Sequence, residues 1–217
     1  MIESGRFYKT PDKTDKGTVV TFEITGNLPK DYGNEGLKGP LPVRVYRGNR
    51  TSSEFIMFYK YVRLGSSFTG NPETSGEAIL EKYQWLKTHD FPVVPTLRYD
   101  PEKELLLMTM LEDENNIIFD KHHQFPFKIN NFDQVIAEAK RIIKAAYMNG
   151  RGVYLPAEAL ALVVNLQTRN ARVIILDIGV FSYRLDGSNN PLTDCISESI
   201  SEFVKLLRLK QESTKES

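Results

Sequence analysis

The chain has 217 residues, of which 41% are hydrophobic and 26% are charged, and its 28 basic and 28 acidic side chains give a formal net charge of zero. This composition suffices for one large domain or two small lobes, and the balanced charge does not favour binding to nucleic acid or to an anionic membrane. A single cysteine, Cys195, excludes an internal disulfide and a multi-cysteine zinc site and is typical of a reducing compartment.

The N-terminal residues lack the charged and then apolar pattern of a secretory signal. No apolar run approaches the roughly 18 residues of a membrane span. We therefore expect a soluble, cytoplasmic protein that contacts no membrane.

The first half of the chain predicts an antiparallel sheet with one inserted helix. Thr74 and Glu77 have the spacing of a capping box, and apolar residues at helical spacing predict a helix that ends at Thr88. Turn residues from Gly48 onward join two of the expected strands into a hairpin. Strands are expected over residues 18–25, 43–47, 55–62, 96–99 and 105–111.

The second half predicts helices and one further hairpin. Residues 112–131 have the polar composition of a connecting segment. A broad apolar stripe predicts a helix over 132–147, and a last helix is expected from about Thr193 to Leu207. Two strands, 162–166 and 171–176, form the predicted hairpin between these helices.

The most informative stretch of the chain lies at the end of that hairpin. The uniformly apolar residues 173–176 predict a strand buried on both faces, and Asp177 follows where the strand leaves the core. A carboxylate at this point can meet a metal-bound phosphate, while Gly179 lets the chain turn away. The alternative is a strand that ends at an ordinary Asp-x-Gly turn.

The order of these elements resembles the protein-kinase-like fold at separated points between residues 33 and 207. Phe58-Tyr-Lys-Tyr-Val62 is similar to the strand that carries the family's phosphate-contacting lysine, here Lys60. The segment that begins at Glu81 resembles the helix with its partner glutamate, for which Glu77 is a rival. Asp-Ile-Gly179 matches the metal-binding Asp-Phe-Gly motif with one conservative change.

The resemblance implies an α+β, two-lobed fold with an antiparallel-sheet N-lobe, one helix in that lobe and a truncated helical C-lobe. The N-lobe would span residues 1–111, the hinge and connector 112–131, and the C-lobe 132–210, followed by a frayed tail over 211–217.

Departures from the family affect the catalytic half of the site. Where the family carries His-Arg-Asp and a later Asn, this chain has Tyr154-Leu-Pro156 and Ala161. Neither Pro156 nor Ala161 can accept a proton or bind a cation. Glu158 is the only nearby carboxylate, and Asn165 lies too far along the strand to substitute without a shifted alignment.

The resemblance assigns roles to the remaining candidates. Lys60 would contact a nucleotide phosphate, Glu81 would position Lys60, and Asp177 would hold Mg²⁺. Backbone near Met110, Glu112 and Asp113 would meet adenine. Solvated surface side chains are the alternative reading for both Lys60 and Glu81.

The leading hypothesis is a degenerate kinase, or pseudokinase, that binds a partner protein, with ATP and Mg²⁺ as candidate ligands. One alternative is an active atypical phosphotransferase, on a protein or a small molecule, with Glu158 as the base. The other is an interaction module without a ligand in the cleft. The adjacent His122 and His123 lack the spacing of a metal site, and Cys195 beside Ile196 is read as a small buried hydrophobe.

Overall fold

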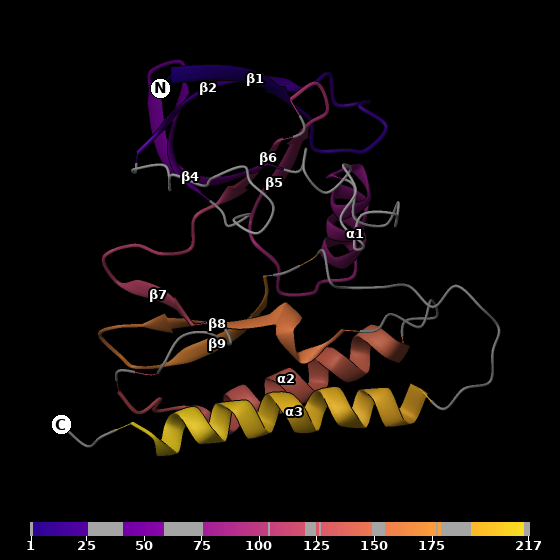
Figure 1. Cartoon of the computed structure of the whole chain (residues 1–217), viewed down its shortest axis with the longest axis vertical. Helices are drawn as coiled ribbons and strands as arrows, with labels where there is room; N and C mark the ends of the chain where they lie inside the picture. Colours follow the sequence, from indigo (N-terminus) through magenta and orange to yellow (C-terminus); the bar gives the residue numbers. More distant parts are fainter. Residues whose placement is uncertain are drawn as a thin grey trace. The chain divides into compact units, whose positions relative to one another are not determined.

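The computed structural model describes residues 2–25, 41–58, 76–103, 105–119, 125, 127–148, 155–176, 178 and 192–214. These residues belong to two compact units, an N-terminal unit (Met1–Asp90 with Val94–Met110) and a C-terminal unit (Phe91–Val93 with Leu111–Ser217). Antiparallel sheets and helices make up the described chain, so the predicted α+β class is confirmed (Figure 1).

The N-terminal unit contains one sheet of six antiparallel strands in the order β1-β2-β3-β4-β6-β5. The strand bounds are β1 (Ile2–Phe7), β2 (Thr18–Ile24), β3 (Leu41–Arg47), β4 (Arg50–Phe58), β5 (Leu97–Asp100) and β6 (Leu105–Thr109). The sequence did not predict β1, because residues 3–6 are polar or glycine and carry little strand propensity. Pairing with the β-branched residues of β2 supplies what the local sequence lacks.

The hairpin of β3 and β4 differs from its prediction. The return strand begins at Arg50 rather than at Phe55, because Arg47 and Arg50 already pair across a two-residue turn. Gly48 in this turn has a φ of 59°, a backbone conformation that glycine adopts without strain. Residues 59–62 of the predicted strand lie outside the described residues.

Backbone hydrogen bonds bring the first and last strands of this sheet together. The Tyr8 N–H donates to the Tyr99 carbonyl at 2.8 Å, and the Tyr99 N–H donates back at 2.9 Å. Gly5 makes a close approach possible, because a Cβ at that position would collide with the Asp100 carboxylate. The sheet therefore curls around an apolar inner face that is formed by Phe7, Val20, Phe22, Val43, Val45, Leu105 and Leu107.

Helix α1 (Gly76–Thr88) packs on the opposite face of the sheet, which confirms the predicted helix. Asp100 shares the inner face with Leu105, so the neighbouring Tyr99 points outward, and its ring lies against Gly76. Ile79, Leu80, Tyr83 and Leu86 are buried, and the Tyr83 hydroxyl donates to the Pro95 carbonyl at 2.9 Å.

The C-terminal unit contains a three-stranded antiparallel sheet in the order β7-β8-β9 and two long helices. Its elements are β7 (Asn116–Phe119), α2 (Phe132–Met148), a 3₁₀ turn (Ala157–Ala159), β8 (Leu160–Asn165), β9 (Ala171–Ile175) and α3 (Leu192–Glu212). Both helices and the β8–β9 hairpin were predicted. Strand β7 was not predicted, because its four residues fall in the expected connecting segment and become a strand only through pairing with β8.

Helix α2 is tied to the sheet by two polar side chains. The Glu138 carboxylate accepts from the Val173 N–H at 3.1 Å, and the Asn131 amide exchanges two hydrogen bonds of 2.8 Å with the backbone of Ala171. The apolar side of the helix, which includes Val135, Ala139 and Ile142, is buried. In the described ranges, no helix combines the length and apolar character that crossing a membrane requires.

Candidate functional site

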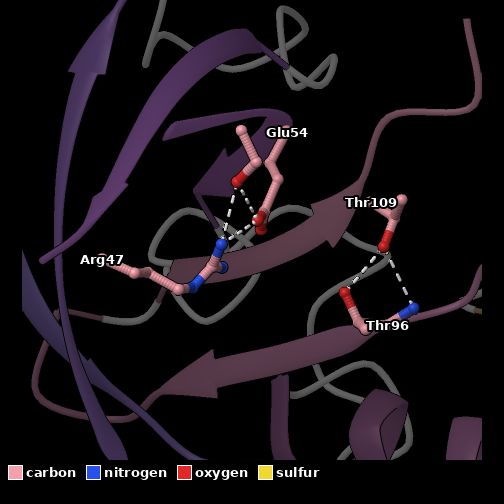
Figure 2. A network of polar contacts seen from close by, with 5 residues as sticks. Arg47, Glu54, Thr96 and Thr109 are labelled. Carbon is pink, nitrogen blue, oxygen red and sulfur yellow. Dashed lines mark hydrogen bonds and ion pairs between the residues drawn. The ribbon is translucent and has the colours of Figure 1, made fainter. Parts of the chain in front are cut away.

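Charged side chains gather on the inner face of the N-terminal sheet, and we call Arg47, Ser52, Glu54 and Arg98 the inner polar cluster. Nη1 of Arg47 lies 2.6 Å from Oε1 of Glu54 and donates to the Ser52 hydroxyl at 2.9 Å. The Ser52 hydroxyl donates to the same Glu54 oxygen at 2.9 Å (Figure 2). Glu54 is a buried carboxylate whose side chain is only 7% exposed, whereas that of Arg47 is 27% exposed.

Strand register explains why these polar groups share a face with the apolar core. Val45 pairs with Ser52, and Val43 pairs with Glu54, so both polar side chains point to the inner face. Arg47 continues the alternation of Val43 and Val45. Arg98 pairs with the core residue Leu107 and lies on this face as well.

The cluster lies at one end of the sheet, where several strands begin or end. The turn after Arg47, the start of β5 and the end of β6 meet there, since Glu54 pairs with Thr109, the last residue of β6. The hydroxyls of Thr96 and Thr109 are 2.7 Å apart, and the Thr96 N–H donates to the Thr109 hydroxyl at 3.1 Å (Figure 2). A polar end thus adjoins the apolar interior of the curled sheet.

Two arginines share this end, and their charges interact. Burial lowers the pKa of the Arg98 guanidinium, and the positive charge of Arg47 lowers it further. The negative charges of Glu54 and Asp15 oppose these effects but do not cancel them. The guanidinium groups and hydroxyls at this end of the curled sheet are donors that suit a charged ligand.

Local sequence patterns did not predict this cluster, although they contain one signal for it. Arg47 falls on the same alternating positions as Val43 and Val45, which predicts an inward-facing charge. Nothing local connects that position with Arg98, which is 51 residues later in the chain (98 minus 47).

Neither of the two glutamates that the sequence offers as partners of Lys60 is buried. Glu81 is exposed on α1, and Glu77 lies 4.0 Å from Lys13 with both side chains about half exposed. The charged side chain that α1 buries is Lys82, which is 2% exposed. Lys60 lies outside the described residues, so its predicted pairing with Glu81 stays a prediction.

In the segment predicted to bind adenine, Met110 to Asp113, the last two residues form hydrogen bonds with β7. In the C-terminal unit, the Asp113 N–H donates to the Asn116 carbonyl at 2.9 Å, and the Asp113 carboxylate accepts from the Asn116 N–H at 2.8 Å. The Glu112 carboxylate accepts from the Ile118 N–H at 3.3 Å. These groups cover the edge of β7 that does not pair with β8. In the N-terminal unit, Met110 directly follows β6 and is half-buried.

Asp113 gives this edge a dependence on pH. Hydrogen bonds from the Asn115 N–H and from Asn116 lower the pKa of its carboxyl below the usual 3.8. The stabilising contribution of the ionised group is therefore fully present above about pH 3.8 and is lost as the pH falls through the lower native pKa. We expect Asp113→Ala to melt below the wild type at pH 7, with a difference that shrinks toward pH 2. Melts followed by circular dichroism measure this difference in Tm. Asp113→Asn, which keeps one acceptor oxygen, is the control. A difference in Tm that does not change with pH would contradict the role of the ionised Asp113 carboxylate.

The positions predicted to replace the catalytic residues lie at the start of β8. Ala161 is 2% exposed and pairs with Ile174 inside the sheet. Glu158 belongs to the 3₁₀ turn that precedes the strand. Asn165, the residue that a shifted alignment would use, caps the β8–β9 turn: its side-chain oxygen accepts from the Gln167 and Thr168 N–H groups at 3.1 and 2.9 Å.

Asp177 and the pair His122-His123 lie outside the described residues. Leu176, directly before Asp177, donates its N–H to the Ala159 carbonyl at 2.9 Å, and Ile178 is buried. Leu176 and Ile178 both belong to the C-terminal unit. Within the part of the chain that the structure describes, no three His, Cys, Asp or Glu side chains come together as a metal site.

No protein-family model matches the chain, and no curated protein is significantly similar to it in sequence. The functional assignment therefore depends on the residues themselves.

Proposed function

We propose that this chain is a degenerate, kinase-like protein that binds a partner protein and lacks efficient phosphoryl transfer. The observation that carries the proposal is the chemistry of two positions. Pro156 and Ala161 stand where the kinase family has its catalytic Asp and metal-binding Asn, and neither side chain can accept a proton or hold a cation.

The described surroundings of these positions support the same reading. Ala161 is buried and pairs with Ile174 of the neighbouring strand, so its position is not exposed to a ligand. A shift of the alignment by four residues would bring in Asn165, but its side chain is already committed to the β8–β9 turn. Neither alignment supplies a side chain for the second metal ion that phosphoryl transfer uses.

The order of elements along the chain supports the kinase resemblance. An antiparallel sheet carries one helix, α1, between β4 and β5, and β6 leads into an irregular segment at residues 110–115. Helix α2 follows, and the β8–β9 hairpin ends just before Asp177. This is the order that the resemblance implies.

We further propose ATP with Mg²⁺ as the ligand of the remaining half of the site. Lys60 would neutralise phosphate as a point charge, and Asp177 would supply the oxygen ligand that Mg²⁺ prefers. Glu81 is exposed and is therefore free to pair with Lys60. Replacing Glu81 tests this proposed pairing.

Thermal melts with ATP, with and without Mg²⁺, test the proposal on the wild type and on Asp177→Ala. A ligand that binds only the folded chain at a hundredfold excess over its Kd raises the free energy of unfolding by about 2.7 kcal/mol. We expect a Mg²⁺-dependent rise in Tm that Asp177→Ala abolishes. Glu202→Ala, which removes an exposed carboxylate from α3, is the matched control and should keep the rise.

Radiolabelled ATP then tests for transfer to protein and to water. We expect a rate no higher than that of Asp177→Ala. Transfer that Asp177→Ala abolishes would contradict the proposal and favour the active phosphotransferase, in which case Glu158→Gln should reduce the rate by about 10²–10⁴-fold if Glu158 is the base. No rise in Tm with ATP would reject the nucleotide and leave a plain interaction module.

A further inference from the structure

Arg98 of the inner polar cluster carries a charge that the described chain does not neutralise by contact. Among the described residues its guanidinium forms no hydrogen bond and no ion pair within 4.0 Å, and its Nε is buried without a partner. A guanidinium has five N–H donors, and burying one of them, here Nε, without a partner is costly. Side chains that break this rule are expected at functional sites.

The neighbouring groups have unused hydrogen-bonding capacity as well. Five buried side-chain atoms of the described chain have no partner, and four of them belong to this end of the sheet: Nε of Arg47, Nε of Arg98, Oε2 of Glu54 and Oδ1 of Asp15. Glu54 is more than nine-tenths buried, so its free oxygen is not open to bulk solvent. Most of the buried polar atoms without a hydrogen-bond partner are therefore concentrated at this end of the sheet.

In a purely structural ion network we would expect each charged group to have a partner of opposite charge. Arg98 would pair with the free oxygen of Glu54 or of Asp15, yet neither forms a salt bridge with it. Instead, Glu54 pairs with Arg47, and Arg98 has no ion pair although the charge of Arg47 is close enough to lower its pKa. Two neighbouring guanidinium groups repel each other unless an anion lies between them. The 27% exposure of the Arg47 side chain shows that this end of the cluster can be reached from solvent.

We propose that Arg47 and Arg98 bind the oxyanion group, a phosphate or a carboxylate, of a small molecule at this end of the N-terminal sheet. The planar guanidinium fork matches both groups in a bidentate manner. Glu54 and Ser52 orient Arg47, whose side chain keeps 27% of its surface exposed. This site involves neither Lys60 nor Asp177 and is independent of the proposed function.

Calorimetry and thermal melts in sodium phosphate, sodium acetate and sodium chloride of equal ionic strength test the proposal. At ten times its Kd, a bound oxyanion multiplies the ratio of folded to unfolded protein about elevenfold. We expect phosphate, acetate or both to raise the Tm above its value in chloride. Arg98→Met should abolish the rise, and Arg98→Lys, which keeps the charge but loses the fork, should weaken binding about tenfold or more.

Arg44→Met is the matched control, because Arg44 is an exposed arginine of the same strand as Arg47. It should keep the oxyanion response, and so should Asp177→Ala, which separates this site from the proposed nucleotide site. Equal Tm values in the three salts, or a response that Arg98→Met and Arg98→Lys both keep, would overturn the proposal. Equal values would indicate that ordered water alone satisfies the cluster.

Discussion

Replacing Glu54 with alanine is expected to destabilise the N-terminal unit by about 3 kcal/mol, the low end for breaking a buried ion pair, because Glu54 is buried while Arg47 is partly exposed. Glu54 is almost fully buried and lies 2.6 Å from Nη1 of Arg47. Without it, Arg47 loses its carboxylate partner, and Ser52 loses its acceptor. The free energy of unfolding in urea measures the effect, and the chain's single tryptophan, Trp85 of α1, reports on this unit.

A double-mutant cycle separates the ion pair from simple loss of packing. Arg47→Met combined with Glu54→Leu removes both charges, and this pair of changes should recover most of the stability that Glu54→Ala loses. Glu23→Ala is the control, because Glu23 of β2 also holds a cross-strand partner, the Tyr46 hydroxyl at 2.9 Å, but is only partly buried. It should cost about 1 kcal/mol. A cost for Glu54→Ala no larger than that of Glu23→Ala would contradict the role of the pair.

Asp100→Ala is expected to cost about 3 kcal/mol, because one carboxylate satisfies three backbone N–H groups. Asp100 is 1% exposed and accepts from Arg6 at 2.9 Å, from Glu102 at 3.0 Å and from Lys103 at 3.2 Å. Each donor left unsatisfied costs about 1–3 kcal/mol when buried and less when water reaches it. The bond to Arg6 also holds β1 against β5, so urea unfolding and hydrogen exchange of the β1 amides should both report the change.

Two variants of the same turn test this account. Asp100→Asn keeps one acceptor oxygen and should lose about half as much stability as Asp100→Ala. Glu102→Ala changes an exposed side chain of the turn and should stay within about 0.5 kcal/mol of the wild type. If Asp100→Ala unfolded with the same midpoint as Glu102→Ala, the three hydrogen bonds would not be stabilising the junction of β1 and β5.

The candidate site was harder to predict than the elements that carry it. Alternation along β3 already places Arg47 on the face of Val43 and Val45. Its interaction with Arg98 depends on the curl of the sheet, which brings together inner-face side chains of strands that do not pair with each other. The edge-covering role of Asp113 was equally hidden, because it depends on a strand that the sequence did not predict.

Local patterns were sufficient for α1, α2, α3 and the β8–β9 hairpin, because helical periodicity, apolar runs and turn residues act between near neighbours in sequence. The sequence also shows directly that the side chains of Pro156 and Ala161 cannot accept a proton, since the chemistry of a side chain does not depend on the fold. Strands β1 and β7, the polar end of the curled sheet and the burial of Lys82 in place of Glu81 were decided by tertiary structure. Each depends on partners far away in the chain, and the free energy of burying or pairing a group is set by the groups around it rather than by its neighbours in sequence.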